Sequence, residues 1–182
     1  MTVDLSLYHN NLHQPAGTFK RIFWYYINIV IYKSGLIPFY GIKTAILKLF
    51  GATIGNNVII KPSVNIKYPW NLHIGNNVWI GENVWIDNLV AVKIGNNVCL
   101  SQGVTLINGN HNYKKKYFDL MIAPIVIEDG VWVCTKSIIH GGTTLEENVV
   151  LLSGSVTSEK LTKDGVYRGN PAVRIRERQF SE

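Results

Sequence analysis

The stretch IGNNVWIGENVWID, residues 74–87, carries the pattern that decides the fold. Its isoleucines Ile74, Ile80 and Ile86 recur every six residues, and a valine follows each of them four residues later. A six-residue period does not match the 3.6-residue repeat of an α-helix or the 3.5-residue repeat of a coiled coil. A short, fixed period of this kind is typical of a solenoid.

The same six-residue spacing extends to both sides of this stretch. The sequence IGNNV begins at residues 54, 74 and 94, and the spacing resumes at Ile127 and runs to Leu151. Three hexads make one triangular coil, with the aliphatic residues inside the prism and Gly and Asn at the corners, because both tolerate positive φ. The sequence therefore predicts an all-β solenoid of stacked parallel coils over residues 51–160.

The repeat is interrupted in a regular way. The coils that begin at Ile54 and Ile74 each run two residues long, and one hexad plus a 15-residue excursion separates Leu106 from Ile127. All of these extra residues follow the third hexad of their coil and so lie on the same face of the prism. We therefore expect residues 68–70, 87–88 and 108–124 to stack along one edge. Loops that leave a rigid scaffold at one place are frequent positions for functional sites.

The segment before the solenoid, residues 1–50, is predicted to be a helical, aromatic cap on the open first coil. Two apolar stripes are expected to face the coil, with Lys43 and Lys48 turned away: Phe19, Ile22, Phe23, Tyr26, Ile27, Val30 and Ile31, then Ile42, Ala45, Ile46, Leu49 and Phe50. Oligomer packing is a second interpretation of these stripes. A third is an interfacial membrane anchor, because Lys20 and Arg21 adjoin the aromatic residues.

Composition limits the class of protein. The net charge of +6 favours an anionic partner such as a phosphate-bearing cofactor, although a solvated basic surface would also account for it. Cys99 and Cys134 form no CxxC pair or disulfide framework, no signal peptide is visible, and the apolar run Ile22–Tyr32 is too short to span a bilayer. These features predict a cytoplasmic protein, peripheral at the inner membrane if the cap binds lipid.

Five motifs resemble those of the hexapeptide-repeat acyltransferases, above all the colanic-acid-type O-acetyltransferases and more distantly the galactoside, maltose and nodulation-factor acetyltransferases. They are IKPSVNIKYPW (60–70), WIGENVWIDN (79–88), GNHNY (109–113), IEDGVWV (127–133) and YRGNPAVRIRER (167–178). The resemblance implies a left-handed parallel β-helix, a homotrimer with sites between copies, and acetyl-CoA as co-substrate without a metal. It also implies a sugar acceptor in exopolysaccharide biosynthesis and no nucleic-acid partner.

His111, in the excursion, is the predicted catalytic residue. An imidazole can take the proton of a hydroxyl and later give it to the departing thiolate near neutral pH. The resemblance implies this general-base role, with direct transfer in a ternary complex. Asp87, Asn88 and Asn110 are the expected acceptor-binding residues, although Asp and Asn are also common turn residues.

The resemblance also implies a CoA groove along the later coils and the basic tail, residues 161–182. The residues expected there are Trp132, Cys134, Ser153, Gly154, Ser158, Arg168, Arg174 and Arg176. Arginines suit the CoA phosphates because they can bind them bidentately. Cys134 and Thr135 depart from the usual family residues, as do Ser158 and Glu159, which puts individual cofactor contacts in doubt.

Alternative functions remain at this stage. The same chemistry could serve a streptogramin-like antibiotic, a nucleotide sugar or another small molecule, and a prism without activity could act as a trimeric scaffold. A zinc-dependent carbonic anhydrase on this fold is disfavoured, since the solenoid contains no H-x₄-H spacing. A covalent acyl-enzyme on Cys134 is disfavoured because no base is evident beside it.

Overall fold

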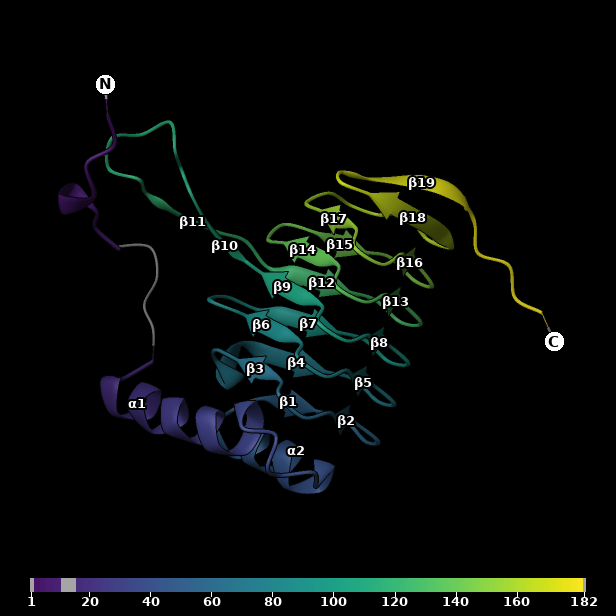
Figure 1. Ribbon diagram of the computed structural model, residues 1–182, viewed down its shortest axis with the longest axis horizontal. Coiled ribbons are helices and arrows are strands. Elements are labelled where there is room, and N and C mark those ends of the chain that lie inside the picture. The colour runs from purple at the N-terminus through teal and green to yellow at the C-terminus, as the bar shows by residue number, and fades with distance from the viewer. Residues whose placement is uncertain (1, 11–15, 182) are drawn as a thin grey trace.

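The structure is a computed structural model that describes residues 2–10 and 16–181; residues 1, 11–15 and 182, which fall in the predicted cap and tail, lie outside the described residues. The chain winds through a stack of coils that cross three parallel sheets in turn, with helices at one end and a hairpin at the other (Figure 1). This confirms the parallel β-helix predicted from the hexads.

Each sheet takes one short strand from every full coil, and sheet B also contains a longer antiparallel hairpin at its end. Sheet A contains β1 (Thr53–Ile54), β4 (Leu72–Ile74), β7 (Val92–Ile94), β12 (Ile125–Ile127) and β15 (Thr144–Leu145). Sheet B contains β2 (Ile59–Ile60), β5 (Trp79–Ile80), β8 (Cys99–Leu100), β13 (Trp132–Val133), β16 (Val150–Leu151), β18 (Gly165–Gly169) and β19 (Ala172–Glu177). Sheet C contains β3 (Asn65–Ile66), β6 (Trp85–Asp87), β9 (Thr105–Ile107), β14 (Ile138–His140) and β17 (Val156–Thr157).

The core is a set of ladders that run from coil to coil. In sheet A, Ile54, Ile74, Ile94, Ile127 and Leu145 stand in register, and each is buried. Equivalent ladders line the inner faces of sheets B and C. Because each coil buries its apolar residues only against its neighbours, the stack forms one continuous core.

Asparagine and glycine have different structural roles at the corners of the coils. Asn57, Asn77 and Asn97 take the left-handed conformation, with φ of 54°, 57° and 55°. The preceding glycines serve a different purpose, since a Cβ at Gly75 would lie 2.7 Å from the carbonyl oxygen of Gly95 in the next coil. The prediction of positive φ therefore holds for these asparagines and for the corner glycines Gly103, Gly130 and Gly154, whereas Gly75 is needed for close stacking.

The cap consists of α1 (Thr18–Ile27), the π-helical turn η2 (Asn28–Lys33) and α2 (Tyr40–Leu49), which lie across the first coil (Figure 1). The indole Nε1 of Trp24 donates to the carbonyl oxygen of Ile66 at 2.9 Å. The Nζ of Lys43 donates to the carbonyl oxygens of Ile60 and Lys61, each at 3.2 Å. The cap thus satisfies carbonyls that have no earlier coil to pair with.

The predicted orientation of the stripes was right only in part. Ile27, Ile31 and Ile46 pack against the core and Lys48 is exposed, as predicted. Phe19 and Leu49 are exposed, whereas Lys43 is fully buried, and burial lowers the pKa of its ammonium group. The helices carry apolar residues on both sides, so their pattern alone does not tell which side faces the coil. Trp24 and Lys43 face it because they supply donors for the unpaired carbonyls, as well as apolar surface.

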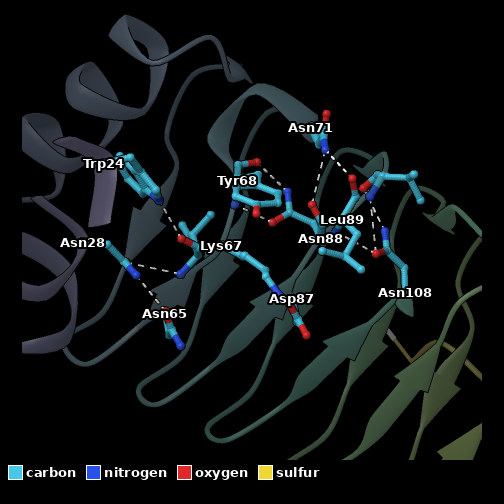
Figure 2. Close-up of polar contacts among 12 residues, drawn as sticks. Trp24, Asn28, Asn65, Lys67, Tyr68, Asn71, Asp87, Asn88, Leu89 and Asn108 are labelled. Atoms are coloured by element: carbon cyan, nitrogen blue, oxygen red, sulfur yellow. Dashed lines mark hydrogen bonds and ion pairs between the residues drawn. The ribbon is translucent and has the colours of Figure 1, made fainter. Parts of the chain in front are cut away.

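The surplus residues stack along one edge of sheet C, as predicted. The side-chain oxygen of Asn88 accepts from the Tyr68 N–H at 2.9 Å, and its amide nitrogen donates to the Tyr68 carbonyl at 2.7 Å (Figure 2). One coil later, the side-chain oxygen of Asn108 accepts from the Leu89 N–H at 2.8 Å. This edge ladder, which also includes η3 (Pro69–Asn71), fixes the point where the excursion leaves the solenoid.

Candidate active site

The excursion at 108–124 forms a hairpin that projects from the solenoid (Figure 1). Its strands, β10 (Gly109–His111) and β11 (Leu120–Ile122), pair antiparallel with each other, so that His111 stands opposite Leu120. The segment around η1 (Leu5–Leu7) lies beside the hairpin and is joined to it by the Asp4 N–H, which donates to the Lys116 carbonyl at 3.0 Å. We call this hairpin, residues 109–122, the arm.

The imidazole of His111 is held inside the arm on two sides. Its Nδ1 lies 2.9 Å from the carbonyl oxygen of Phe118. The ring stacks on that of Phe118, with centroids 4.4 Å apart and planes 5° from parallel, and the edge of Tyr8 packs against it at 5.6 Å. Phe118 adopts a φ of 50°, a left-handed conformation that is unfavourable for a bulky residue.

The contact with Phe118 determines the tautomer of His111. A carbonyl oxygen can only accept, so Nδ1 must carry the hydrogen. In a neutral imidazole, Nε2 then has the free lone pair and can accept a proton. One ring nitrogen of His111 is therefore held by the protein, and the other is the nitrogen that can accept a proton.

Asp87 lies at the end of β6, beside the strand that leads into the arm: it pairs in register with Ile107. Its carboxylate forms an ion pair with Lys67 at 2.7 Å, and it points away from the edge ladder (Figure 2). Asp87 and Lys67 line a hollow of about 360 Å³ between α1–η2 and sheet C. Arg21 and Lys33 add two more cations to its wall, and Tyr25, Tyr68 and Trp85 supply aromatic surface.

The two asparagines predicted to bind the acceptor differ in exposure. Asn88 is fully buried, and both ends of its amide bond the backbone of Tyr68, so its side chain serves the edge ladder. Asn110 is exposed, and its side-chain oxygen accepts from the His111 N–H at 2.8 Å. Asn110 also lines a second hollow, of about 380 Å³, together with His140 and Ser158.

The residues expected to bind CoA lie on two different parts of the solenoid. Ser158 shares the second hollow with the base of the arm. Trp132 and Arg176 line a separate hollow of about 880 Å³ on sheet B, beside the C-terminal segment. Ser153, Gly154 and Arg168 are exposed, while Arg174 forms an ion pair with Glu177 at 2.7 Å. A single copy therefore does not gather these residues into one groove.

Sequence reasoning missed several residues that build the site. Phe118 and Tyr8 surround His111 and stand in no recognisable motif. Lys67 pairs with Asp87 and lies within the motif IKPSVNIKYPW, which alone assigned it no role. Cys134 is buried, and burial raises the pKa of its thiol, which makes a thiolate nucleophile unfavourable. Among residues 2–10 and 16–181, no group of three His, Cys, Asp or Glu side chains could hold a metal ion.

Comparisons with known proteins identify relatives of this chain. No family model matches the chain. The putative colanic acid biosynthesis acetyltransferase WcaF of Escherichia coli K12 is 36% identical over 167 residues, which are 92% of this chain and 92% of the relative.

Two solved structures are similar in fold. A galactoside acetyltransferase in complex with coenzyme A has a TM-score of 0.77 and 25% identity, covering 88% of this chain and 82% of the other. A hexapeptide-repeat acetyltransferase from Vibrio cholerae O1 biovar eltor, complexed with acetyl coenzyme A, has a TM-score of 0.82 and 19% identity, covering 92% and 93%.

Proposed function

Because this chain belongs to the hexapeptide-repeat acetyltransferases, we propose that it transfers the acetyl group of acetyl-CoA to a sugar hydroxyl, with His111 as the general base. The observation that carries the proposal is the 2.9 Å contact from His111 Nδ1 to the Phe118 carbonyl, which leaves Nε2 as the proton acceptor. The related structures with bound coenzyme A and acetyl coenzyme A support the choice of donor.

The reaction needs one base that later acts as an acid. Nε2 of His111 takes the proton of the acceptor hydroxyl, and the resulting alkoxide oxygen bonds to the thioester carbonyl carbon. The carbon–sulfur bond then breaks, and the protonated imidazole returns its proton to the CoA thiolate. The products are an acetyl ester and free CoA, and no covalent enzyme intermediate forms.

We place the complete site between two copies of the chain in a homotrimer. His111 projects on the arm from the edge of sheet C, whereas Trp132 and Arg176 line a hollow on sheet B. A cyclic assembly brings the arm of one copy to a different face of the next. The CoA would then lie along sheet B, with arginines of β18 and β19 near its phosphates.

The acceptor is best accommodated by the hollow that contains Asp87. Its aromatic walls suit the apolar faces of a sugar ring, and Asp87 can accept from hydroxyl groups. The relative's name supports an acceptor from exopolysaccharide biosynthesis. Such an acceptor would be made in the cytoplasm.

One observation favours a second candidate acceptor, a sugar that carries a phosphate, such as a nucleotide sugar. Arg21, Lys33 and Lys67 face a single carboxylate, Asp87, in the same hollow. One ion pair leaves two cations in excess there, and this charge suits a phosphate group.

The test measures thiol release from acetyl-CoA across sugars, nucleotide sugars and antibiotics. The variant His111→Ala should lower turnover by at least about 10²-fold while the circular dichroism spectrum stays unchanged, because only the base is lost. The control is His73→Ala, which removes an exposed histidine on sheet A and should keep full activity.

Unchanged turnover in His111→Ala would remove this residue from the mechanism. Wild-type protein that releases no thiol with any acceptor would favour the non-catalytic scaffold.

A further inference from the structure

The cap has a second face that the solenoid does not use. On its outer side, large apolar side chains stand at helical spacing and are exposed to solvent: Phe19, Ile22, Phe23, Tyr26, Val30, Ile42 and Leu49. Phe19 is 92% exposed and Leu49 is 81% exposed. We call these seven residues the cap face.

The fold does not require the cap face to be apolar. The opposite side of the same helices seals the first coil through Trp24, Tyr32, Lys43 and Leu47, all of them buried. The two helices are joined by the contact of Phe23 with Phe50, whose ring centroids lie 5.8 Å apart. On its outer side this pair leaves a shallow apolar hollow of about 640 Å³. A large, contiguous apolar patch on a protein surface usually marks a binding site.

The charge around the cap face has one sign. Residues 5–81 contain seven Lys and Arg residues and no Asp or Glu, whereas the rest of the chain holds the other eleven basic residues and all twelve acidic ones. Lys20, Lys33 and Lys48 are exposed on the cap helices themselves. Lys43 is buried and Lys67 forms an ion pair with Asp87, so the other five basic residues give this end of the molecule its positive charge.

An apolar surface rimmed by lysine residues favours one kind of binding partner over another. A second copy of the cap would bring two acid-free, positively charged surfaces together, which is unfavourable. An anionic bilayer offers both a hydrocarbon boundary for the aromatic rings and negative headgroups for the lysines. None of the helices in the described residues has the length and hydrophobicity of a transmembrane span.

We infer that the cap face binds the surface of an anionic membrane. Helices α1 and α2 lie in the plane of the interface, with Phe19, Tyr26 and Leu49 among the acyl chains. Lys48 extends to the headgroups, as long basic side chains do at interfaces, and Lys20, whose Nζ lies 4.7 Å from the centroid of the Trp70 ring, adds positive charge beside them. Since α1 also forms one wall of the hollow that contains Asp87, this hollow opens close to the headgroup layer.

Co-sedimentation with lipid vesicles tests this inference without using the acetyl transfer reaction. The wild-type protein should bind vesicles of phosphatidylcholine mixed with phosphatidylglycerol, bind pure phosphatidylcholine weakly, and dissociate as salt is added. The variant Phe19→Ser with Leu49→Ser should lose at least about tenfold in vesicle affinity, because each side chain gives up its apolar burial. Lys20→Gln with Lys48→Gln should lose about fivefold per lysine.

Matched controls sit outside the cap. Val173→Ser removes an exposed apolar residue of β19, and Lys136→Gln removes an exposed lysine of the solenoid, and neither should change vesicle binding. Activity toward a soluble acceptor should be the same in the cap-face variants and the wild type.

Failure of the wild type to bind anionic vesicles at low salt would overturn the inference, as would binding that the cap-face substitutions leave unchanged. A lower mass in lipid-free sedimentation for Phe19→Ser with Leu49→Ser would also overturn it, since the cap face would then join copies of the chain.

Discussion

Phe118 holds the most strained backbone conformation around His111 and offers a direct test of how the base is positioned. Its φ of 50° directs its carbonyl toward Nδ1, and its ring stacks on the imidazole. Phe118→Ala removes the stacking surface, so we expect kcat to fall about tenfold through misorientation of His111. The KM for acetyl-CoA should not change, since the donor does not depend on this ring.

Two further results distinguish positioning from a general loss of structure. Phe118→Tyr keeps an aromatic ring and should retain most of the activity. An equal loss of kcat in Phe118→Tyr and Phe118→Ala, or a loss confined to KM, would contradict a positioning role.

At the scale of single elements, the corner where neighbouring coils nearly touch allows a test of stability. A Cβ on Gly75 would lie 2.7 Å from the Gly95 carbonyl oxygen, and neither backbone can move without opening the stack. Gly75→Ala should therefore lower the free energy of unfolding by about 2 kcal/mol or more. Chemical denaturation would measure this loss.

Gly41→Ala is the matched control for this prediction. Gly41 lies in the first turn of α2, and an added Cβ would meet no atom within 4 Å. We expect this variant to gain up to about 1 kcal/mol, because alanine restricts the unfolded chain. Equal stability of the two variants would show that coil spacing is looser than the structure indicates.

The elements also show how far the sequence could predict the structure. The six-residue spacing of Ile74, Ile80 and Ile86 predicts the solenoid because every coil repeats the same burial pattern. The cap has no such repeat, and with Phe19 on one side of α1 and Trp24 on the other its apolar pattern gives no unique orientation. Only the unpaired carbonyls of the first coil, which lie far away in sequence, decide that Lys43 turns inward.

The candidate site, like the fold, could be predicted from the sequence only in part. His111 could be proposed as the base from the interrupted repeat together with the family resemblance. Its partners Phe118 and Tyr8 could not, because their contacts depend on how the arm folds on itself and on residues near the N-terminus. The sequence predicts that Asn88 binds the acceptor sugar. In the fold, both ends of its amide instead form hydrogen bonds with the backbone of Tyr68, a contact that the sequence does not reveal.

At the scale of the whole molecule, the account depends on a site that two copies share. The arm and the sheet B hollow lie on different parts of one solenoid, so His111 and Trp132 should act together only across an interface. Such a site predicts complementation, in which two inactive chains form active oligomers. The variants His111→Ala and Trp132→Ala should each be nearly inactive alone.

The most direct test is acetyl transfer by oligomers assembled from an equal mixture of these two variants. In a cyclic assembly with random mixing, roughly a quarter of the interfaces would join an intact His111 to an intact Trp132. We therefore predict that the mixture recovers about a quarter of the wild-type activity. Activity no higher than that of the separate variants would contradict a site formed between copies.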